Sequence, residues 1–139
     1  MIRIATKEDI KDIAQIENIC FKDAWSELML VESLDNGCIM LVAEKDNKVI
    51  GYAGIYPSGD ITNIAVLPEV RGNGYGKKLV ENLIEIARKN NIDTIFLEVR
   101  QSNRLAIKLY EKCGFKLISK RTKYYKDGED ALIYAFGGV

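Results

Sequence analysis

The chain has 139 residues, 47% of them apolar, which suits one domain with its own core, close to the usual ~150 residues. Twenty basic residues balance twenty acidic ones, so the composition excludes the broad positive charge of proteins that bind a nucleic-acid backbone. Histidine is absent, which excludes Ser-His and Cys-His catalytic pairs and removes the commonest metal ligand, so we expect no metal.

The cysteines and the first residues predict a cytoplasmic protein. The three cysteines stand at positions 20, 38 and 113, an odd number without the close pairs of zinc sites or disulfide frameworks. Residues Met1 to Thr6 alternate like a strand and lead into a charged helix, unlike a secretory leader or a membrane span. We therefore expect a soluble protein that acts on neither membranes nor nucleic acids.

The first half of the chain predicts two helices followed by an antiparallel meander. Thr6 to Asp9 has the pattern of a variant capping box, and a helix with a periodic apolar face follows it. Ser26 is a suitable N-cap for a second helix, which ends at Asn36-Gly37. Three strands are then expected, over residues 38–45, 48–56 and 60–67.

The second half predicts a parallel crossover and a final hairpin. A helix with apolar residues at three- and four-residue spacing follows the glycine-rich loop and reaches Asn90-Asn91. A helix that joins two strands makes them parallel, so the strand at 94–99 should run parallel to the one at 60–67. The remaining expected elements are a helix over 104–113 that ends at Gly114, and strands over 115–126 and 129–136 that turn at Asp127-Gly128.

The most informative stretch runs from Ile64 to Lys77, where an apolar strand enters a glycine-rich loop that opens into an amphipathic helix. Glycines at 72, 74 and 76 permit positive φ and close approach of a ligand. The first N–H groups of a helix lack partners and lie at the positive end of its dipole. The loop is therefore expected to bind an anion.

Two common phosphate-binding loops do not fit. A nucleoside-triphosphate P-loop needs glycine at 71 and Ser or Thr at 78, where this chain has Arg71 and Lys78. A dinucleotide fingerprint needs a third glycine at 77, which is Lys77. Arg71, Gly74 and Gly76 do fit Arg/Gln-x-x-Gly-x-Gly/Ala between a strand and a helix.

This pattern and the order β-α-α-β-β-β-α-β-α-β-β resemble the GCN5-related N-acetyltransferase (GNAT) superfamily along the whole chain. The resemblance implies one α/β (α+β) domain over 1–139: a mixed, mostly antiparallel central sheet of about seven strands with a splayed parallel pair, flanked by four helices. It implies acetyl-coenzyme A as cosubstrate, with its pantetheine arm along the strand at 63–66 and its thioester oxygen near the N–H of Val66. The implied cofactor-binding residues are Ile64, Ala65, Val66, Arg71, Gly72, Asn73, Gly74, Tyr75, Gly76, Lys77 and Asn103.

Glu98 stands out because it interrupts the apolar run from Ile95 to Val99. A central parallel strand should be apolar on both faces, so we expect this carboxyl to be buried, with a raised pKa. An ion pair with Arg100 is one interpretation, and a general base in the cofactor cleft is the other.

A narrower resemblance favours the base. Residues 97–100, Ser102-Asn103, Ala106-Ile107, 109–111 and Gly114-Phe115 are similar to the RimI-type ribosomal-protein alanine N-acetyltransferases. It implies that Glu98 removes the amine proton, that Tyr110 protonates the departing thiolate and that Asn103 contacts the cofactor. Taken alone, Tyr110 would more often be a core aromatic, but its helix follows the Glu98 strand directly.

The sequence signals for binding of the acceptor are less specific than those for the cosubstrate. Trp25, Tyr124 and Tyr125 lie in stretches similar to the family's peptide-binding elements and are candidate substrate-binding residues, although each could equally be a packing aromatic. Cys113 is a poor nucleophile because a helix C-terminus disfavours its thiolate. Direct attack of the amine is the better interpretation.

We expect an acetyl-coenzyme A dependent N-acetyltransferase that modifies the N-terminal α-amine of a protein. Near pH 7.5, deprotonating a lysine costs about 4 kcal/mol, whereas an α-amine with pKa about 8 costs under ~1 kcal/mol. The resemblance suggests a ribosomal protein as acceptor, and the enzyme is expected to be a monomer or a weak homodimer. Two alternatives stay open: a small amine or a lysine as acceptor, and a non-catalytic acyl-coenzyme A sensor.

Overall fold

The computed structural model describes residues 1–137. Its four α-helices and seven strands follow the expected order, with two short 3-10 turns at Lys7–Asp9 and Pro68–Val70. The helices are α1 (Ile10–Cys20), α2 (Glu27–Asp35), α3 (Tyr75–Lys89) and α4 (Arg104–Lys112). The strands are β1 (Ile2–Ile4), β2 (Ile39–Lys45), β3 (Lys48–Ile55), β4 (Ile61–Val66), β5 (Ile95–Arg100), β6 (Lys116–Arg121) and β7 (Ala131–Phe136).

The predicted helix starts are confirmed by their hydrogen bonds. At the 3-10 turn before α1, the Asp9 carboxylate accepts from Thr6 N at 2.8 Å while the Thr6 hydroxyl accepts from Glu8 N at 3.3 Å. Ser26 caps α2 by accepting from Met29 N at 3.2 Å. Each cap satisfies an N–H group that the helix itself cannot pair.

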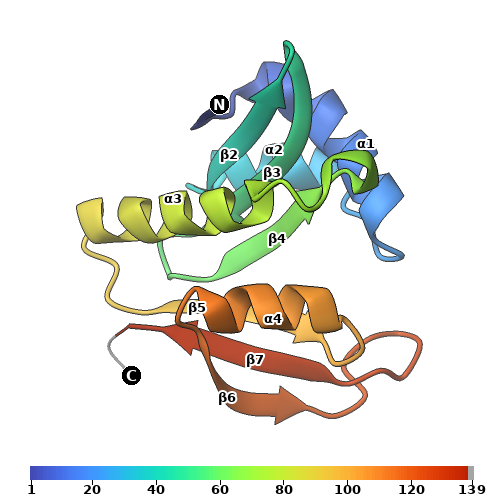
Figure 1. Cartoon of the computed structure of the whole chain (residues 1–139), viewed down its shortest axis with the longest axis vertical. Coiled ribbons are helices and arrows are strands. Elements are labelled where there is room, and N and C mark those ends of the chain that lie inside the picture. Colours follow the sequence, from blue (N-terminus) through green and yellow to red (C-terminus); the bar gives the residue numbers. More distant parts are fainter. Residues whose placement is uncertain (138–139) are drawn as a thin grey trace.

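The strands form two sheets rather than one continuous sheet (Figure 1). β1, β2, β3 and β4 form an antiparallel sheet in that order, and β5, β7 and β6 form a second. The expected parallel pairing is confirmed, but it consists of a single bridge between Asp60, the residue before β4, and Phe96 of β5. Beyond that bridge, the described parts of β4 and β5 form no further ladder, so the two strands diverge from their starting ends.

Helices cover both sheets and create the core between them. In Figure 1, α3 crosses one face of the first sheet, α1 and α2 lie on the opposite face, and α4 covers the second sheet. The stripe predicted for α3 is buried: Leu79, Val80, Leu83, Ile84 and Ala87. None of the helices in the described part of the chain is long and apolar enough to cross a membrane.

The final hairpin differs from the prediction. β6 ends at Arg121 and β7 begins at Ala131, so the strands expected to reach 126 and to start at 129 are shorter, and nine residues form a loop. Polar contacts hold the loop: Asp130 accepts from Lys123 N at 2.8 Å, and Glu129 from Ser102 N at 2.7 Å. Asp130 thus satisfies a backbone donor that a longer β6–β7 ladder would have paired, and Glu129 joins the loop to the segment after β5.

Candidate active site

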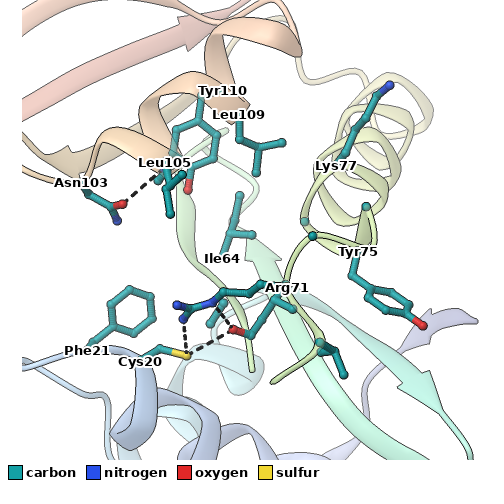
Figure 2. Close-up of a pocket in the computed structure, with 17 residues that line it drawn as sticks. Cys20, Phe21, Ile64, Arg71, Tyr75, Lys77, Asn103, Leu105, Leu109 and Tyr110 are labelled. Atoms are coloured by element: carbon teal, nitrogen blue, oxygen red, sulfur yellow. Dashed lines mark hydrogen bonds between the residues drawn. The ribbon is translucent and has the colours of Figure 1, made fainter. Parts of the chain in front are cut away.

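Two grooves meet in the gap between the sheets. The first has a volume of about 480 Å³ and lies among β4, the glycine-rich loop, the start of α3 and α4 (Figure 2). The second has a volume of about 880 Å³ and lies among the α1–α2 loop, β4, β5 and the β6–β7 loop. The residues that line both grooves are Phe21, Ile64, Asn103 and Tyr110.

The glycine-rich loop beside the first groove contains six consecutive N–H groups without an acceptor among the described residues. Lys78 N donates to Gly74 O, whereas no described residue accepts from the N–H groups of residues 72–77. Gly72 and Gly74 have φ of +86° and +82°, and a Cβ on either would meet nothing within 4 Å. A row of free amides at a helix start, with open space beside it, can hold a diphosphate.

On the side away from β3, the backbone of β4 is largely without partners among the described residues; the exception is Val66 O, which accepts from the Arg71 guanidinium and the Cys20 thiol. Leu67 N donates to Ile50 O, and Val66 lies opposite Gly51. Because antiparallel pairs alternate along the strand, the peptide groups of Val66 and Ile64 point away from β3. This edge faces the gap that the diverging β5 leaves, so it can pair with an extended amide-bearing ligand.

Arg71 folds across the end of β4 rather than along the glycine-rich loop. Its Nε donates to Val66 O at 3.0 Å and its Nη2 contacts Cys20 Sγ at 3.5 Å, as Figure 2 shows. Burial raises the pKa of the Cys20 thiol, and Arg71 opposes that shift. The Arg71 guanidinium thus places a positive charge at the open edge of β4.

Three of the predicted cofactor-binding residues, Asn73, Tyr75 and Lys77, are placed differently from the others relative to the first groove. Asn73 is not among the lining residues, and its Nδ2 donates to Val70 O at 2.9 Å, which leaves its backbone N–H as its contribution. Lys77 and Tyr75 line the groove, but in Figure 2 the Tyr75 ring points away from α4, and the positive charge of Lys77 acts on the Cys113 thiol at the end of α4, where it opposes the rise in pKa that burial causes. The remaining predicted residues line the groove: Ile64, Ala65, Val66, Arg71, Gly72, Gly74, Gly76 and Asn103.

Tyr110 and Asn103 lie where the two grooves meet. Asn103 is the N-cap of α4, and its Oδ1 accepts from Ala106 N at 3.3 Å. Tyr110 extends from α4 with its hydroxyl toward Ile64 (Figure 2). Burial raises the pKa of Tyr110 well above its usual range, so its phenol keeps its proton at neutral pH.

The second groove brings together the other predicted residues. Glu98 lines it from β5, Trp25 from the α1–α2 loop, and Tyr124 and Tyr125 from the β6–β7 loop. The two tyrosine rings meet edge to face, with centroids 5.1 Å apart. The groove therefore combines one carboxyl with three aromatic side chains from separate segments.

The expectation that Glu98 is buried is wrong. The strand alternates, with Ile95, Leu97 and Val99 buried and Glu98 exposed. β4 diverges from β5 before reaching Glu98, so β5 is an open strand there and one face meets the groove. The Glu98 carboxylate still acts on its neighbours: it interacts with the Tyr124 hydroxyl and raises the pKa of that phenol.

Arg100 does not pair with Glu98, so that interpretation is wrong as well. Its guanidinium forms salt bridges with Asp23 at 2.5 Å, Asp127 at 2.9 Å and Glu129 at 2.9 Å. It also stacks over Tyr125, 4.0 Å from the ring centroid. Arg100 therefore joins β5 to both loops that border the second groove, a role that the sequence pattern does not reveal because its partners are distant in the chain.

Comparisons with known proteins agree with this geometry. Residues 10–115 match the acetyltransferase (GNAT) family. A [ribosomal protein bS18]-alanine N-acetyltransferase of Haemophilus ducreyi is 33% identical, over 97% of this chain and 98% of that protein. An N-alpha-acetyltransferase of Saccharolobus solfataricus is 34% identical, over 96% of this chain and 90% of that protein.

The fold agrees with a solved relative. The crystal structure of the ribosomal-protein-S18-alanine N-acetyltransferase from Escherichia coli superposes with a TM-score of 0.90 at 31% identity, and the match covers 99% of this chain and 92% of that one. The seven strands, four helices and diverging β4 and β5 are thus the arrangement of an acyl-transferring fold. The chain belongs to the GNAT family of acetyltransferases, as an N-acetyltransferase that depends on acetyl-coenzyme A.

The residues present fit that cosubstrate. The six free amides of residues 72–77 suit its diphosphate, and the open edge of β4 suits the amides of its pantetheine arm. In the described part of the chain, no three His, Cys, Asp or Glu side chains are placed to hold a metal ion.

Proposed function

We propose that this enzyme acetylates the N-terminal α-amine of a protein, as a RimI-type enzyme acting on a ribosomal protein. The observation that carries this proposal is that the two grooves meet at Tyr110. Glu98 and three aromatic side chains line the second groove. The similarity to a [ribosomal protein bS18]-alanine N-acetyltransferase and to an N-alpha-acetyltransferase supports an α-amine acceptor. The relatives that act on ribosomal protein S18 support a ribosomal protein as the acceptor.

The first groove would hold the cosubstrate. Amides of residues 72–77 would donate to the diphosphate, while Ile64 would pair with the pantetheine arm through its N–H and carbonyl groups. The N–H of Val66 would donate to the thioester oxygen as negative charge develops there. Asn103, at the junction, would contact the arm near its sulfur end.

The acceptor would enter through the second groove. Its amine nitrogen attacks the thioester carbonyl, the C–S bond breaks, and the amine proton passes to Glu98, through water because the Glu98 carboxyl is exposed. Tyr110 gives its proton to the departing thiolate. Trp25, Tyr124 and Tyr125 would contact the first residues of the acceptor chain.

Two measurements test this function: thiol release from acetyl-coenzyme A with a panel of acceptor amines, and binding of the cosubstrate. Turnover of acetyl-coenzyme A should occur with peptides that have a free N-terminus, and it should be weak with N-terminally blocked lysine peptides and with polyamines. Consumption of polyamines alone would assign a small-amine acceptor, and cosubstrate binding with no thiol release on any amine would mean a sensor.

The role of Glu98 is tested by Glu98→Gln. We expect kcat to fall about 100-fold or more, because a positioned general base contributes that much, while coenzyme A affinity by calorimetry stays near normal. Glu85→Gln is the control, since Glu85 is an exposed carboxyl on α3 outside both grooves. Full activity of Glu98→Gln across pH would remove Glu98 from the mechanism.

A further inference from the structure

A carboxyl outside the proposed mechanism lies in the core beside the second groove. Glu17, on α1, is 0% exposed. A buried carboxylate costs several kcal/mol in lost hydration unless hydrogen bonds replace its water. A residue placed there at such cost needs an explanation, and its hydrogen bonds supply one.

Glu17 accepts hydrogen bonds from three different segments. Trp25 N donates to Oε1 at 2.9 Å, and Asn63 Nδ2 donates to Oε1 at 3.1 Å and to Oε2 at 2.9 Å. The hydroxyl of Tyr52, on β3, donates to Oε2. The donors are neutral, and the backbone and amide N–H groups can only donate, so Glu17 acts as the shared acceptor of α1, the α1–α2 loop, β3 and β4.

Two of these donors belong to the second groove. Trp25 and Asn63 both line it, whereas Glu17 and Tyr52 line neither groove. The carboxyl fixes the backbone of Trp25 and, because it can only accept, holds the amide nitrogen of Asn63 toward itself. The Asn63 amide oxygen accepts no hydrogen bond from any described residue, so it is free to accept one from a ligand in the groove.

We propose that Glu17 is a positioning residue for the acceptor amine: it holds Trp25 in place and presents the Asn63 amide oxygen to an N–H of the incoming chain. This inference rests on the proposed function, because it takes the second groove as the acceptor site. Glu17 acts through these two residues and touches neither substrate.

The substitution Glu17→Gln tests the proposal, because the two side chains are almost the same size. With the new NH₂ group at the position of Oε1, Trp25 N loses its acceptor; with it at the position of Oε2, Asn63 Nδ2 faces an NH₂ group and keeps only its longer contact, 3.1 Å, to the remaining oxygen. We expect the acceptor KM to rise about threefold to tenfold, the effect of one hydrogen bond, while the acetyl-coenzyme A KM changes less than about twofold.

A second readout does not depend on activity. Trp25 is the only tryptophan in the chain, so intrinsic fluorescence reports its surroundings directly. Glu17→Leu removes the acceptor of Trp25 N altogether, so it should make Trp25 easier to quench with acrylamide than in the wild type. Quenching equal to that of the wild type would overturn the proposal, because Glu17 would then not hold Trp25.

Asp9→Asn is the matched control. Asp9 is also a buried carboxyl, 6% exposed, but its partners are Arg3 and Thr6 and it lines neither groove. The control should lower stability without changing either KM or the quenching of Trp25. If it raises the acceptor KM as much as Glu17→Gln does, or if both KM values rise together in Glu17→Gln, the effect is general loosening and the proposal is wrong.

Asn63→Ala keeps the proposal testable if Glu17→Gln does not fold. It removes the amide from the groove but leaves Glu17 with its Trp25 and Tyr52 contacts, and it should raise the acceptor KM similarly. An unchanged acceptor KM would overturn the role of Asn63. If the wild type acetylates no peptide, the proposed function fails, and the quenching comparison still decides separately whether Glu17 positions Trp25.

Discussion

At the scale of single residues, Tyr110 has the most specific position. It lines both grooves, and its ring packs against Phe115 with centroids 6.0 Å apart. Burial keeps its phenol protonated by raising its pKa. The phenol therefore still carries its proton at neutral pH, and its place at the junction of the grooves makes it our candidate donor of a proton to the thiolate.

Tyr110→Phe should lower kcat about 100-fold or more, because it removes a positioned acid and keeps the ring that packs in the core. Coenzyme A affinity should change little. Tyr134→Phe is the control: Tyr134 is a buried tyrosine whose hydroxyl donates to Glu111 at 3.0 Å, outside both grooves. The control should lose about 1 kcal/mol of stability and keep its kcat. Thiol-release kinetics equal to those of the wild type in Tyr110→Phe would exclude the acid role.

The same buried phenols predict how stability changes with pH. Burial raises the folded-state pKa of Tyr125 to about 12, and that of Tyr110 also lies above its ordinary value. The folded state therefore holds these protons more tightly than the unfolded chain. Their contribution is complete below about pH 10, the ordinary tyrosine pKa, and is lost as pH rises through the folded pKa.

Urea unfolding between pH 9 and 12 measures this effect. The unfolding free energy should fall across that range, and more gently in Tyr125→Phe than in the wild type. An equally steep fall in that variant would show that Tyr125 titrates normally.

At the scale of elements, the glycine-rich loop combines an unusual backbone with open space. Gly74 is the N-cap of α3 with φ of +82°, a conformation that a side chain adopts only with strain. A Cβ there would project into space that we assign to the diphosphate. Gly128, in the β6–β7 loop, has φ of +87° and equally open surroundings, but it lines neither groove.

Comparing the alanine variants of these two glycines separates the effect of backbone strain from the effect of a lost ligand contact. Gly74→Ala and Gly128→Ala should each destabilise the fold by about 1 kcal/mol, because each places an alanine in the left-handed region. The acetyl-coenzyme A KM should rise in Gly74→Ala and stay unchanged in Gly128→Ala. Steady-state kinetics and thermal melting give both quantities, and equal KM values in the two variants would argue against a diphosphate at this loop.

At the scale of the whole molecule, the two sheets are joined edge to edge by one parallel bridge, between Asp60 and Phe96. Their divergence beyond it leaves the β4 backbone open and exposes Glu98 to the second groove. The divergence of the sheets thus provides both a strand edge with which an extended ligand can pair and an opening through which an amine can reach Glu98. Arg100 and Glu17 then join the bordering loops to the sheets.

The order of elements could be predicted from the sequence because it depends on local signals: the caps at Thr6 and Ser26, the apolar stripe of α3, and the glycines of the loop. The exposure of Glu98 could not, because it depends on where β4 and β5 separate. The hydrogen bonds of Glu17 join four segments, although a carboxyl on the apolar face of a helix was a readable signal. Confinement to one domain over 1–139, the monomer or weak dimer, and the cytoplasmic location stay predictions.

A crystal structure of the complex with coenzyme A tests the central claim most directly. We expect the diphosphate to accept hydrogen bonds from the amides of residues 72–77, the pantetheine arm to pair with β4, and the sulfur to lie beside the Tyr110 hydroxyl. A diphosphate bound away from this loop, or a sulfur distant from both Tyr110 and Glu98, would contradict the account.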